Sequence, residues 1–274
     1  MKYCRFLLDS EPHYGAVEDR NGELWIERVI AAPDEDLAFR LAHARAASPE
    51  EFCNVEFEPR PLSQAQLLPP VTPSKIICVG RNYKAHAAEL GNEVPKEPML
   101  FFKPPSSLLA SGGVVRLPAN AGRVDFEGEL VLVIGKRTHK LQPQDNWREV
   151  LRGVTLANDI SARKLQKKDG QWARAKGYDT FCPLGPIVSD ELDLEAGLTI
   201  ETRVNGEVRQ HATTLDLIFP IPELLVYISA AFTLEPGDII LTGTPAGVGP
   251  LAPGDRVEVT IPGLGVLTNS VEAD

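Results

Sequence analysis

The sequence predicts a β-rich α+β fold in which sheets carry most of the core. Short apolar segments of about 4–8 residues, each closed by glycine or proline, recur along the chain and are typical of buried strands. Two Asn-Gly pairs, Asn21-Gly22 and Asn205-Gly206, stand between strand-like segments and predict tight hairpins. Helical periodicity occurs in few places. These features favour packed or rolled sheets over a helical bundle.

From Lys75 onward the predicted elements follow one another closely. Apolar, β-branched segments predict strands at 75–80, 98–104, 129–136, 154–161 and along both arms of a hairpin at 198–214. Apolar residues spaced three and four apart predict helices at 81–90, 145–154 and 221–232. Two Pro-Gly-Asp turns, at 236–238 and 253–255, separate short strands near the end of the chain.

The first 70 residues differ from the rest of the chain in their pattern of predicted elements. A hairpin at 18–25 is followed by an Ala-rich stretch at 34–47 that has helical character. Five prolines at 58–75 then interrupt regular structure, as in a linker or a draped connection. We therefore predict a small N-terminal domain with its linker at 1–70 and a larger domain at 71–274.

Composition excludes several classes of function. The chain has 274 residues and a formal net charge of −10, with no block of Lys and Arg, which argues against a nucleic-acid partner. Asp9 and Glu11 interrupt the apolar N-terminal run, so a signal peptide is not expected, and no segment reaches the roughly 18 apolar residues of a membrane span. We expect a cytoplasmic protein with four reduced cysteines, Cys4, Cys53, Cys78 and Cys182.

Three carboxylates stand in strand-like surroundings. Glu127 and Glu129 are two apart, so in a strand they share a face, and Asp159 lies near the end of another apolar strand. Half-buried carboxylates repel one another unless a cation holds them. A basic side chain or a divalent ion such as Mg²⁺, Mn²⁺ or Ca²⁺ would serve, and the alternative is an exposed strand end. The third acid favours the metal site.

Other polar residues admit two interpretations each. His86 and Glu89 are three apart, so a helix places them on one side as a general base and its partner, or as an ordinary solvated face. The Gly-rich segment 241–250 presents backbone N–H groups and the Thr244 hydroxyl to an anion, or is a plain turn. Lys176, in a loop, is on its own a solvated lysine.

Taken together, these segments resemble the fumarylacetoacetate hydrolase family. The resemblance covers about residues 74–272 and rests on the joint order of VGRNYKAHAAELG, FFKPPSSL, VDFEGELVLVIGK, LANDISAR, AKGYDTFCPLGP, VNGEVRQ and ILTGTPAGVG. It implies a mixed β-roll catalytic domain, usually in a homodimer, with a small N-terminal domain like that of many bacterial members.

The resemblance also assigns roles to residues. It implies that Glu127, Glu129 and Asp159 bind one Mg²⁺ or Mn²⁺, which Ca²⁺ can replace in a crystal. It carries over His86 and Glu89 as the pair that activates water, on a segment that can order as a lid, and Lys176 as the lysine near substrate and metal. Residues expected to bind substrate are Thr244, which contacts its carboxylate, and Arg81, Tyr83, Ser106, Gln171 and Gly243, which lie in or near motif segments.

The expected activity is metal-dependent hydrolysis of a carbon–carbon bond in a small 2,4-dioxo acid, an acylpyruvate. The substrate oxygens would chelate the metal, and cleavage would release an enolate. Isomerisation of 2-hydroxydienedioates and decarboxylation of oxaloacetate use the same enolate and remain alternatives. A remote alternative from another class is a non-catalytic β domain with a structural Ca²⁺.

Overall fold

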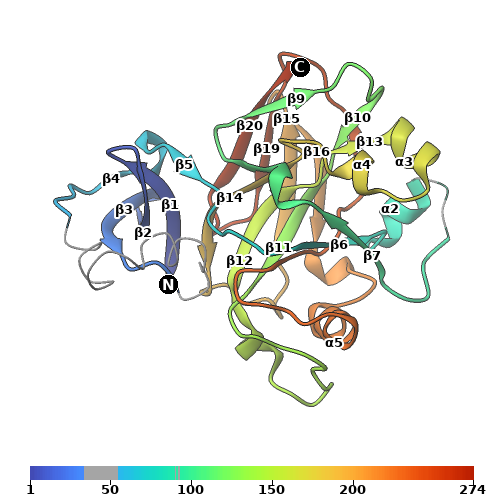
Figure 1. Cartoon of the computed structure of the whole chain (residues 1–274), viewed down its shortest axis with the longest axis horizontal. Helices are drawn as coiled ribbons and strands as arrows, with labels where there is room; N and C mark the ends of the chain where they lie inside the picture. The colour runs from blue at the N-terminus through green and yellow to red at the C-terminus, as the bar shows by residue number, and fades with distance from the viewer. Residues whose placement is uncertain (34–54, 90, 92) are drawn as a thin grey trace.

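A large sheet of twelve strands runs through the computed structural model, which describes residues 1–33, 55–89, 91 and 93–274 (Figure 1). The predicted helix at 34–47 and Cys53 lie outside the described residues. The strands of this sheet are β1 (Lys2–Leu8), β2 (Glu11–Arg20), β3 (Glu23–Ile30), β4 (Arg60–Pro61), β5 (Leu67–Leu68), β6 (Ile76–Gly80), β7 (Met99–Lys103), β8 (Leu108–Ala110), β11 (Gly128–Ile134), β12 (Leu151–Asn158), β14 (Cys182–Ser189) and β17 (Ile239–Leu241). Their order is β4-β3-β2-β1-β14-β12-β11-β17-β6-β7, with β5 on β1 and β8 on β14.

Two smaller sheets complete the β structure. A five-stranded sheet has the order β16 (Glu207–Thr213), β15 (Thr199–Val204), β19 (Arg256–Thr260), β20 (Val266–Ala273) and β9 (Val114–Leu117). A three-stranded sheet has the order β13 (Ser161–Ala162), β10 (Val124–Phe126) and β18 (Gly249–Pro250). Both predicted hairpins are confirmed, and the positive φ angles of both residues in each Asn-Gly turn match the type I′ turn.

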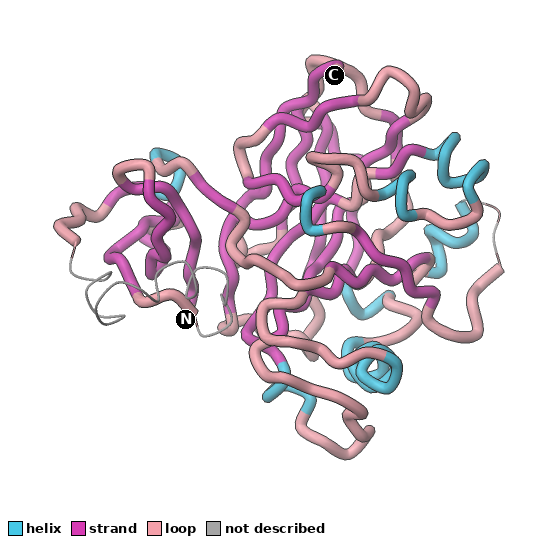
Figure 2. Tube along the Cα trace, viewed as in Figure 1, coloured by secondary structure: helices cyan, strands magenta, loops and turns pink. Residues whose placement is uncertain are grey.

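Helices are few and lie around the sheets (Figure 2). The α-helices of the described residues are α2 (Lys84–Glu89), α3 (Arg163–Asp169), α4 (Ala173–Lys176) and α5 (Ile221–Ala231). Single 3-10 turns are η1 (Leu62–Gln64), η2 (Pro105–Ser107), η3 (Trp147–Val150) and η4 (Thr214–Asp216). No helix in the described part of the chain is long and apolar enough to cross a membrane. The β-rich prediction is confirmed.

Strand β11 shows why the core run LVLVI is continuously apolar. Leu130, Leu132 and Ile134 belong to one buried cluster, together with residues of α5, β19 and β20. Val131 and Val133 belong to another cluster on the opposite face, with residues of β1, β6 and β14. A strand covered on both faces needs no polar alternation.

One prediction of local structure is wrong. The predicted helix at 145–154 is instead the short turn η3 followed by strand β12. Within the proline-rich segment 58–75, predicted as a linker or a draped connection, β4 pairs with β3 and β5 pairs with β1. Strand β1 in turn pairs with β14, so the N-terminal strands continue the large sheet. The domain boundary at residue 70 stays a prediction.

Candidate active site

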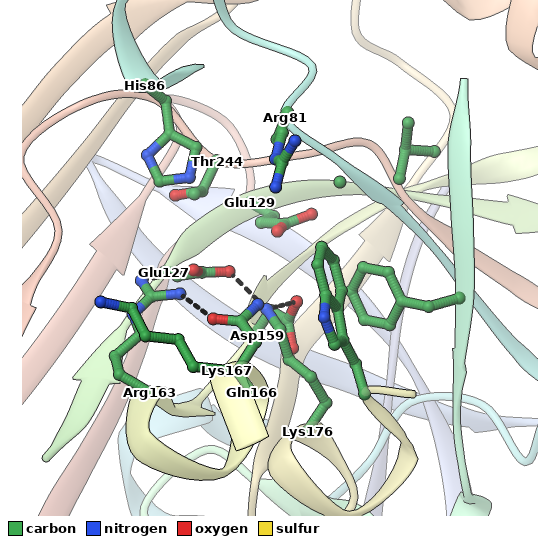
Figure 3. Close-up of a pocket in the computed structure, with 14 residues that line it drawn as sticks. Arg81, His86, Glu127, Glu129, Asp159, Arg163, Gln166, Lys167, Lys176 and Thr244 are labelled. Atoms are coloured by element: carbon green, nitrogen blue, oxygen red, sulfur yellow. Dashed lines mark hydrogen bonds and ion pairs between the residues drawn. The ribbon is translucent and has the colours of Figure 1, made fainter. Parts of the chain in front are cut away.

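A cavity of about 300 Å³ lies where α2, α3 and α4 gather beside the strands (Figures 1 and 3). Its walls carry three carboxylates, four cationic side chains, one histidine and two aromatic rings. The sequence had predicted seven of the residues that line it: Arg81, His86, Glu127, Glu129, Asp159, Lys176 and Thr244. Five further residues line the cavity that the sequence did not indicate as site residues: Arg163, Gln166, Lys167, Phe101 and Trp172.

The three predicted carboxylates come together at one end of two paired strands. Gly128 of β11 lies opposite Asn158 of β12, so Glu127 and Asp159, just beyond the paired residues, are brought side by side. The Asn158 side chain accepts a hydrogen bond from the Glu127 N–H at 2.8 Å and fixes this turn of the chain. One ligand oxygen from each of the three carboxylates lies within 4.8 Å of the others, and all three residues are buried.

One detail of the strand prediction needs correction. Glu127 and Glu129 do not share one continuous strand, because Glu127 falls between β10 and β11, which belong to different sheets. Both side chains nevertheless reach the cavity. Gly128 between them has no room for a side chain, since a Cβ there would lie 2.1 Å from Thr202 Oγ1. The glycine lets the chain change sheets in a closely packed place.

Two buried lysines and the half-buried Arg163 compensate the carboxylates. The Lys176 ammonium donates to Glu127 Oε2 at 2.7 Å and to Asp159 Oδ2 at 2.6 Å. Lys103 donates to Asp159 Oδ1 at 2.7 Å and to the Lys176 carbonyl. Arg163 Nη2 lies 2.6 Å from Glu127 Oε1. Lys103 was missed because it reads as the end of an apolar strand, 56 residues before its partner Asp159.

The carboxylates differ in how far these cations stabilise their charged forms. Burial opposes the charge of Glu127, but Lys176 and Arg163 outweigh it and hold the pKa of that carboxyl well below its usual range. Burial, Asp159 and Glu127 together raise the pKa of Glu129 well above its usual value. Its nearest compensation is the Gly243 N–H, which donates to Oε2 at 2.7 Å. Lys176 and this N–H therefore balance the charge of Glu129 only in part.

This donor set fits a divalent metal ion. Carboxylate oxygens are the ligands that Mg²⁺, Mn²⁺ and Ca²⁺ prefer. A cation beside Glu129 would satisfy the carboxyl whose charge the protein leaves least balanced. Glu127, Glu129 and Asp159 are the residues that would hold it.

The predicted base, His86, also lines the cavity, whereas its partner Glu89 does not. His86 on α2 is buried, and its Nδ1 lies 3.4 Å from Glu89 Oε2. Burial lowers the pKa of His86 below its usual 6.5, while Glu127 and Glu89 oppose that shift. Glu89 in turn accepts hydrogen bonds from the Gly247 N–H at 3.1 and 3.2 Å. A neutral imidazole is therefore held at the upper wall of the cavity (Figure 3).

The Gly-rich segment 241–250 supports the site mainly through hydrogen bonds to the chain itself. The Thr244 hydroxyl donates to the Gly128 carbonyl at 2.9 Å and accepts from Gln210 Nε2 at 2.8 Å. Gln210 Oε1 also accepts from the Gly128 N–H at 3.0 Å. Thr244 lines the cavity, and its contact with a substrate carboxylate stays a prediction, whereas Gly243 donates its N–H to Glu129 and does not line the cavity.

Besides Gly243, three residues expected near the substrate do not line the cavity. Tyr83 is buried and bridges to Leu217, whereas Ser106 and Gln171 are exposed. Gln166 on α3 lines the cavity, as does Trp172, the residue after Gln171. The substrate-binding roles of Tyr83, Ser106 and Gln171 stay predictions.

Comparisons with known proteins match both the fold and the sequence. A family model described as fumarylacetoacetate (FAA) hydrolase C-terminal matches residues 75–272. Protein Rv2993c of Mycobacterium tuberculosis is 49% identical over 256 residues, which cover 88% of this chain and 96% of that protein. An oxaloacetate tautomerase of Bacillus subtilis is 42% identical over 224 residues, covering 77% of this chain and 74% of that protein. A crystal structure of 2-hydroxyhepta-2,4-diene-1,7-dioate isomerase from Mycobacterium marinum has a TM-score of 0.83 and 39% identity, covering 100% of this chain and 99% of that chain.

The fold and the carboxylate cluster define a β-rich protein with a site suited to a metal ion and a small organic acid. The chain belongs to the fumarylacetoacetate hydrolase family. The resemblance seen in the sequence motifs is thereby confirmed, and relatives named as tautomerases and isomerases are enzymes of this family.

Proposed function

We propose that this chain is a metal-dependent enzyme that enolises small 2-oxo acids, with keto–enol tautomerisation of oxaloacetate as its main reaction. The observation that carries the proposal is that His86 and a three-carboxylate cluster lie on the walls of one small cavity. The names of two relatives, an oxaloacetate tautomerase and a dienedioate isomerase, support enolisation over other chemistry.

Glu127, Glu129 and Asp159 would hold Mg²⁺ or Mn²⁺. When bound, such an ion acts as a Lewis acid that acidifies the carbon next to the substrate ketone and stabilises enolate charge. The Lys176 ammonium, fixed between Glu127 and Asp159, adds positive charge at the same end of the cavity.

His86 is the residue suited to move the proton. Its neutral imidazole would take a proton from carbon 3, and the C–H electron pair would become the double bond between carbons 2 and 3. The π pair of the ketone moves to its oxygen. Return of the proton from the imidazolium to that oxygen gives the enol, with no net change in composition. Glu89 would orient the ring and stabilise its charged form.

Hydrolysis of an acylpyruvate is the second candidate. Glu89 is 33% exposed at its side chain, so the His86 pair stands where water can reach it. His86 would then deprotonate water, and hydroxide would attack the 4-carbonyl. The bond between carbons 3 and 4 would break to give a carboxylic acid and a pyruvate enolate, which takes up a proton. Isomerisation and decarboxylation pass through the same enolate. A structural Ca²⁺ gives no reason for His86 to face the cluster.

The test is a substrate panel on metal-stripped protein with and without Mg²⁺ or Mn²⁺. The panel contains enol-oxaloacetate, acetylpyruvate and a 2-hydroxy-2,4-dienedioate, with products identified by NMR. Metal-dependent conversion of enol- to keto-oxaloacetate, faster than any other reaction, is the expected result. Acetate and pyruvate as the main products would establish the hydrolase instead. Turnover that ignores the metal would overturn the proposed site.

A further inference from the structure

We propose that Asn82 is a positioning residue, whose side-chain amide orients one backbone peptide so that this peptide donates a hydrogen bond to Glu129. The peptide is the one that joins Thr242 to Gly243. This inference rests on the proposed function, in which Glu129 is one of three residues that would hold the metal ion. Glu129 faces the cavity (Figure 3), whereas Asn82 acts from outside the cavity lining.

The order of the strands brings these segments together although they are far apart in the sequence. β6 and β17 are parallel neighbours, so the segments that follow them, which contain Asn82 and Thr242, leave the sheet at the same edge. β11 runs antiparallel to β17 on its other side, and its register brings Glu129 level with Gly243. The peptide after β17 therefore lies between Asn82 and Glu129.

This peptide takes part in two hydrogen bonds, one on each side. Its carbonyl, that of Thr242, accepts from Asn82 Nδ2 at 2.8 Å. Its N–H, that of Gly243, donates to Glu129 Oε2 at 2.7 Å. A hydrogen bond to the carbonyl polarises a peptide and strengthens its N–H as a donor. Asn82 therefore supports the donor to a carboxylate whose charge the surrounding residues balance only in part.

The orientation of the Asn82 amide is itself fixed by a third segment. Its Oδ1 accepts from the Phe219 N–H at 2.8 Å, and its Nδ2 also donates to the Phe219 carbonyl at 3.1 Å. A flipped amide would place Oδ1 against two carbonyl oxygens, so the donor has to face Thr242. Asn82 is 0% exposed, so bulk water does not compete for these groups.

The glycine at 243 makes the orientation of the peptide depend on this contact. Its φ is 106°, and a Cβ there would lie 2.8 Å from Asn82 Cβ and 3.2 Å from the Val79 carbonyl oxygen. The absence of a side chain lets Asn82 approach closely, but it also leaves the backbone more freedom to rotate. The hydrogen bond from Asn82 supplies the restraint that a glycine does not supply itself.

The same residue also anchors the segment that carries His86. The Asn82 carbonyl accepts from the Ile218 N–H at 2.8 Å, and α2 begins two residues later, at Lys84. The proposed base and a proposed metal ligand are therefore both tied to one buried asparagine.

A selective NMR experiment tests the orientation of the peptide, because Thr-Gly occurs once in the sequence, at 242–243. In protein made by cell-free synthesis with carbonyl-¹³C threonine and ¹⁵N glycine, a carbonyl-edited amide spectrum contains one cross peak, that of the Gly243 N–H. Glu129→Gln replaces a charged acceptor with a neutral one, so the amide proton should move upfield. After Asn82→Ala or Asn82→Leu, adding Glu129→Gln should leave the peak in place, because the peptide no longer points at this side chain.

Calorimetry with Mg²⁺ is the second measurement. Both Asn82 variants lack the Nδ2 donor, and each should bind Mg²⁺ about 10–100-fold more weakly, as for other residues that orient metal ligands. Asn269 is the matched control, since it is 3% exposed and its Nδ2 donates to the Ala110 and Gly113 carbonyls at 2.9 and 3.0 Å, outside the cavity lining. Asn269→Ala and Asn269→Leu should lower the melting temperature and change neither Mg²⁺ affinity nor the cross peak.

A cross peak that responds to Glu129→Gln as strongly in the Asn82 variants as in the unmodified protein would overturn the inference. Equal loss of Mg²⁺ affinity in the Asn82 and Asn269 variants would also overturn it, since a buried amide anywhere would then have the same effect. The proposed function can fail separately. Unmodified protein that binds no Mg²⁺ and converts no 2-oxo acid would overturn that function, and the cross peak would still decide whether Asn82 orients the peptide.

Discussion

The floor and the roof of the cavity are built in different ways. The floor consists of Glu127, Glu129 and Asp159 with the cations Lys103, Arg163 and Lys176 around them. Its carboxylates are between 1% and 4% exposed and meet their partners at 2.6–2.7 Å.

The roof consists of His86, Glu89 and Arg81, on and just before α2. It rests on longer contacts, such as the 3.4 Å pair of His86 with Glu89, and Glu89 is 33% exposed at its side chain. The difference teaches that the strands fix the charge array, whereas a short helix and the residues just before it carry the groups that we propose to act on the substrate. Substitutions in the floor should therefore have the largest effects.

Glu129→Gln tests the floor. It keeps an oxygen for the Gly243 N–H and leaves Asp159 to Lys103 and Lys176, so the fold should persist while a metal ligand is lost. We expect a loss of Mg²⁺ binding by calorimetry and a fall in turnover of roughly a thousandfold. Glu149→Gln, at an exposed surface glutamate, is the matched control and should change neither. Full activity of Glu129→Gln in metal-depleted buffer would show that the floor is not a metal site.

His86→Gln separates the roof from the floor. The variant removes the base and leaves every carboxylate contact of the floor intact, so metal binding should be unchanged. Turnover should fall by about 10²–10⁴, which is typical for loss of a general base. Calorimetry with Mg²⁺ and NMR assays on the same sample make the separation visible. Turnover at the unmodified rate would move the proton transfer to another residue.

Gln210→Met tests a residue that links the floor to the Gly-rich segment 241–250. Gln210 is 1% exposed and links the Gly128 N–H of the floor to Thr244 and the Pro245 carbonyl. Its loss should weaken metal binding about 10–100-fold, as for other residues that orient metal ligands. The control is Thr202→Val on the paired strand, since the Thr202 hydroxyl is buried without a hydrogen-bond partner. Equal effects of the two variants on metal affinity would reduce Gln210 to ordinary packing.

The strands of the floor could be predicted from sequence because their burial is local information. LVLVI is apolar on both faces, and acids at strand ends signal a site. The helix predicted at 145–154 does not form, although the apolar residues that predicted it are packed in the core as expected. Val150 and Val154 belong to one core cluster, with Trp147 and Leu151 packed against it, and a turn followed by a strand buries the same residues. Short apolar segments do not distinguish the two.

The partners of the site were harder to predict because they depend on contacts between distant segments. Lys103 and Asp159 meet only through the sheet, and Gln210 reaches Gly128 from another sheet, 82 residues away. The motif resemblance indicated Gln171, which is exposed, whereas Gln166 on the short helix α3 lies on the cavity wall. Motif order could locate the loop and could not tell which of its side chains points inward.

Glu89→Gln should have the smallest effect and acts within the roof. The charged form of His86 is favoured by Glu127 and by Glu89 and disfavoured by burial and Arg163, so the pKa of His86 lies below 6.5. The base form is required, so the rate should fall as pH drops through that pKa. Glu89→Gln removes contributions that raise the pKa, which should move the acid limb to lower pH and reduce the plateau about threefold to tenfold. A pH–rate profile measures both, with exposed Glu93→Gln as the control. An acid limb that moves to higher pH would mean that Glu89 does not support the charged imidazole, and the roof would then act through another base.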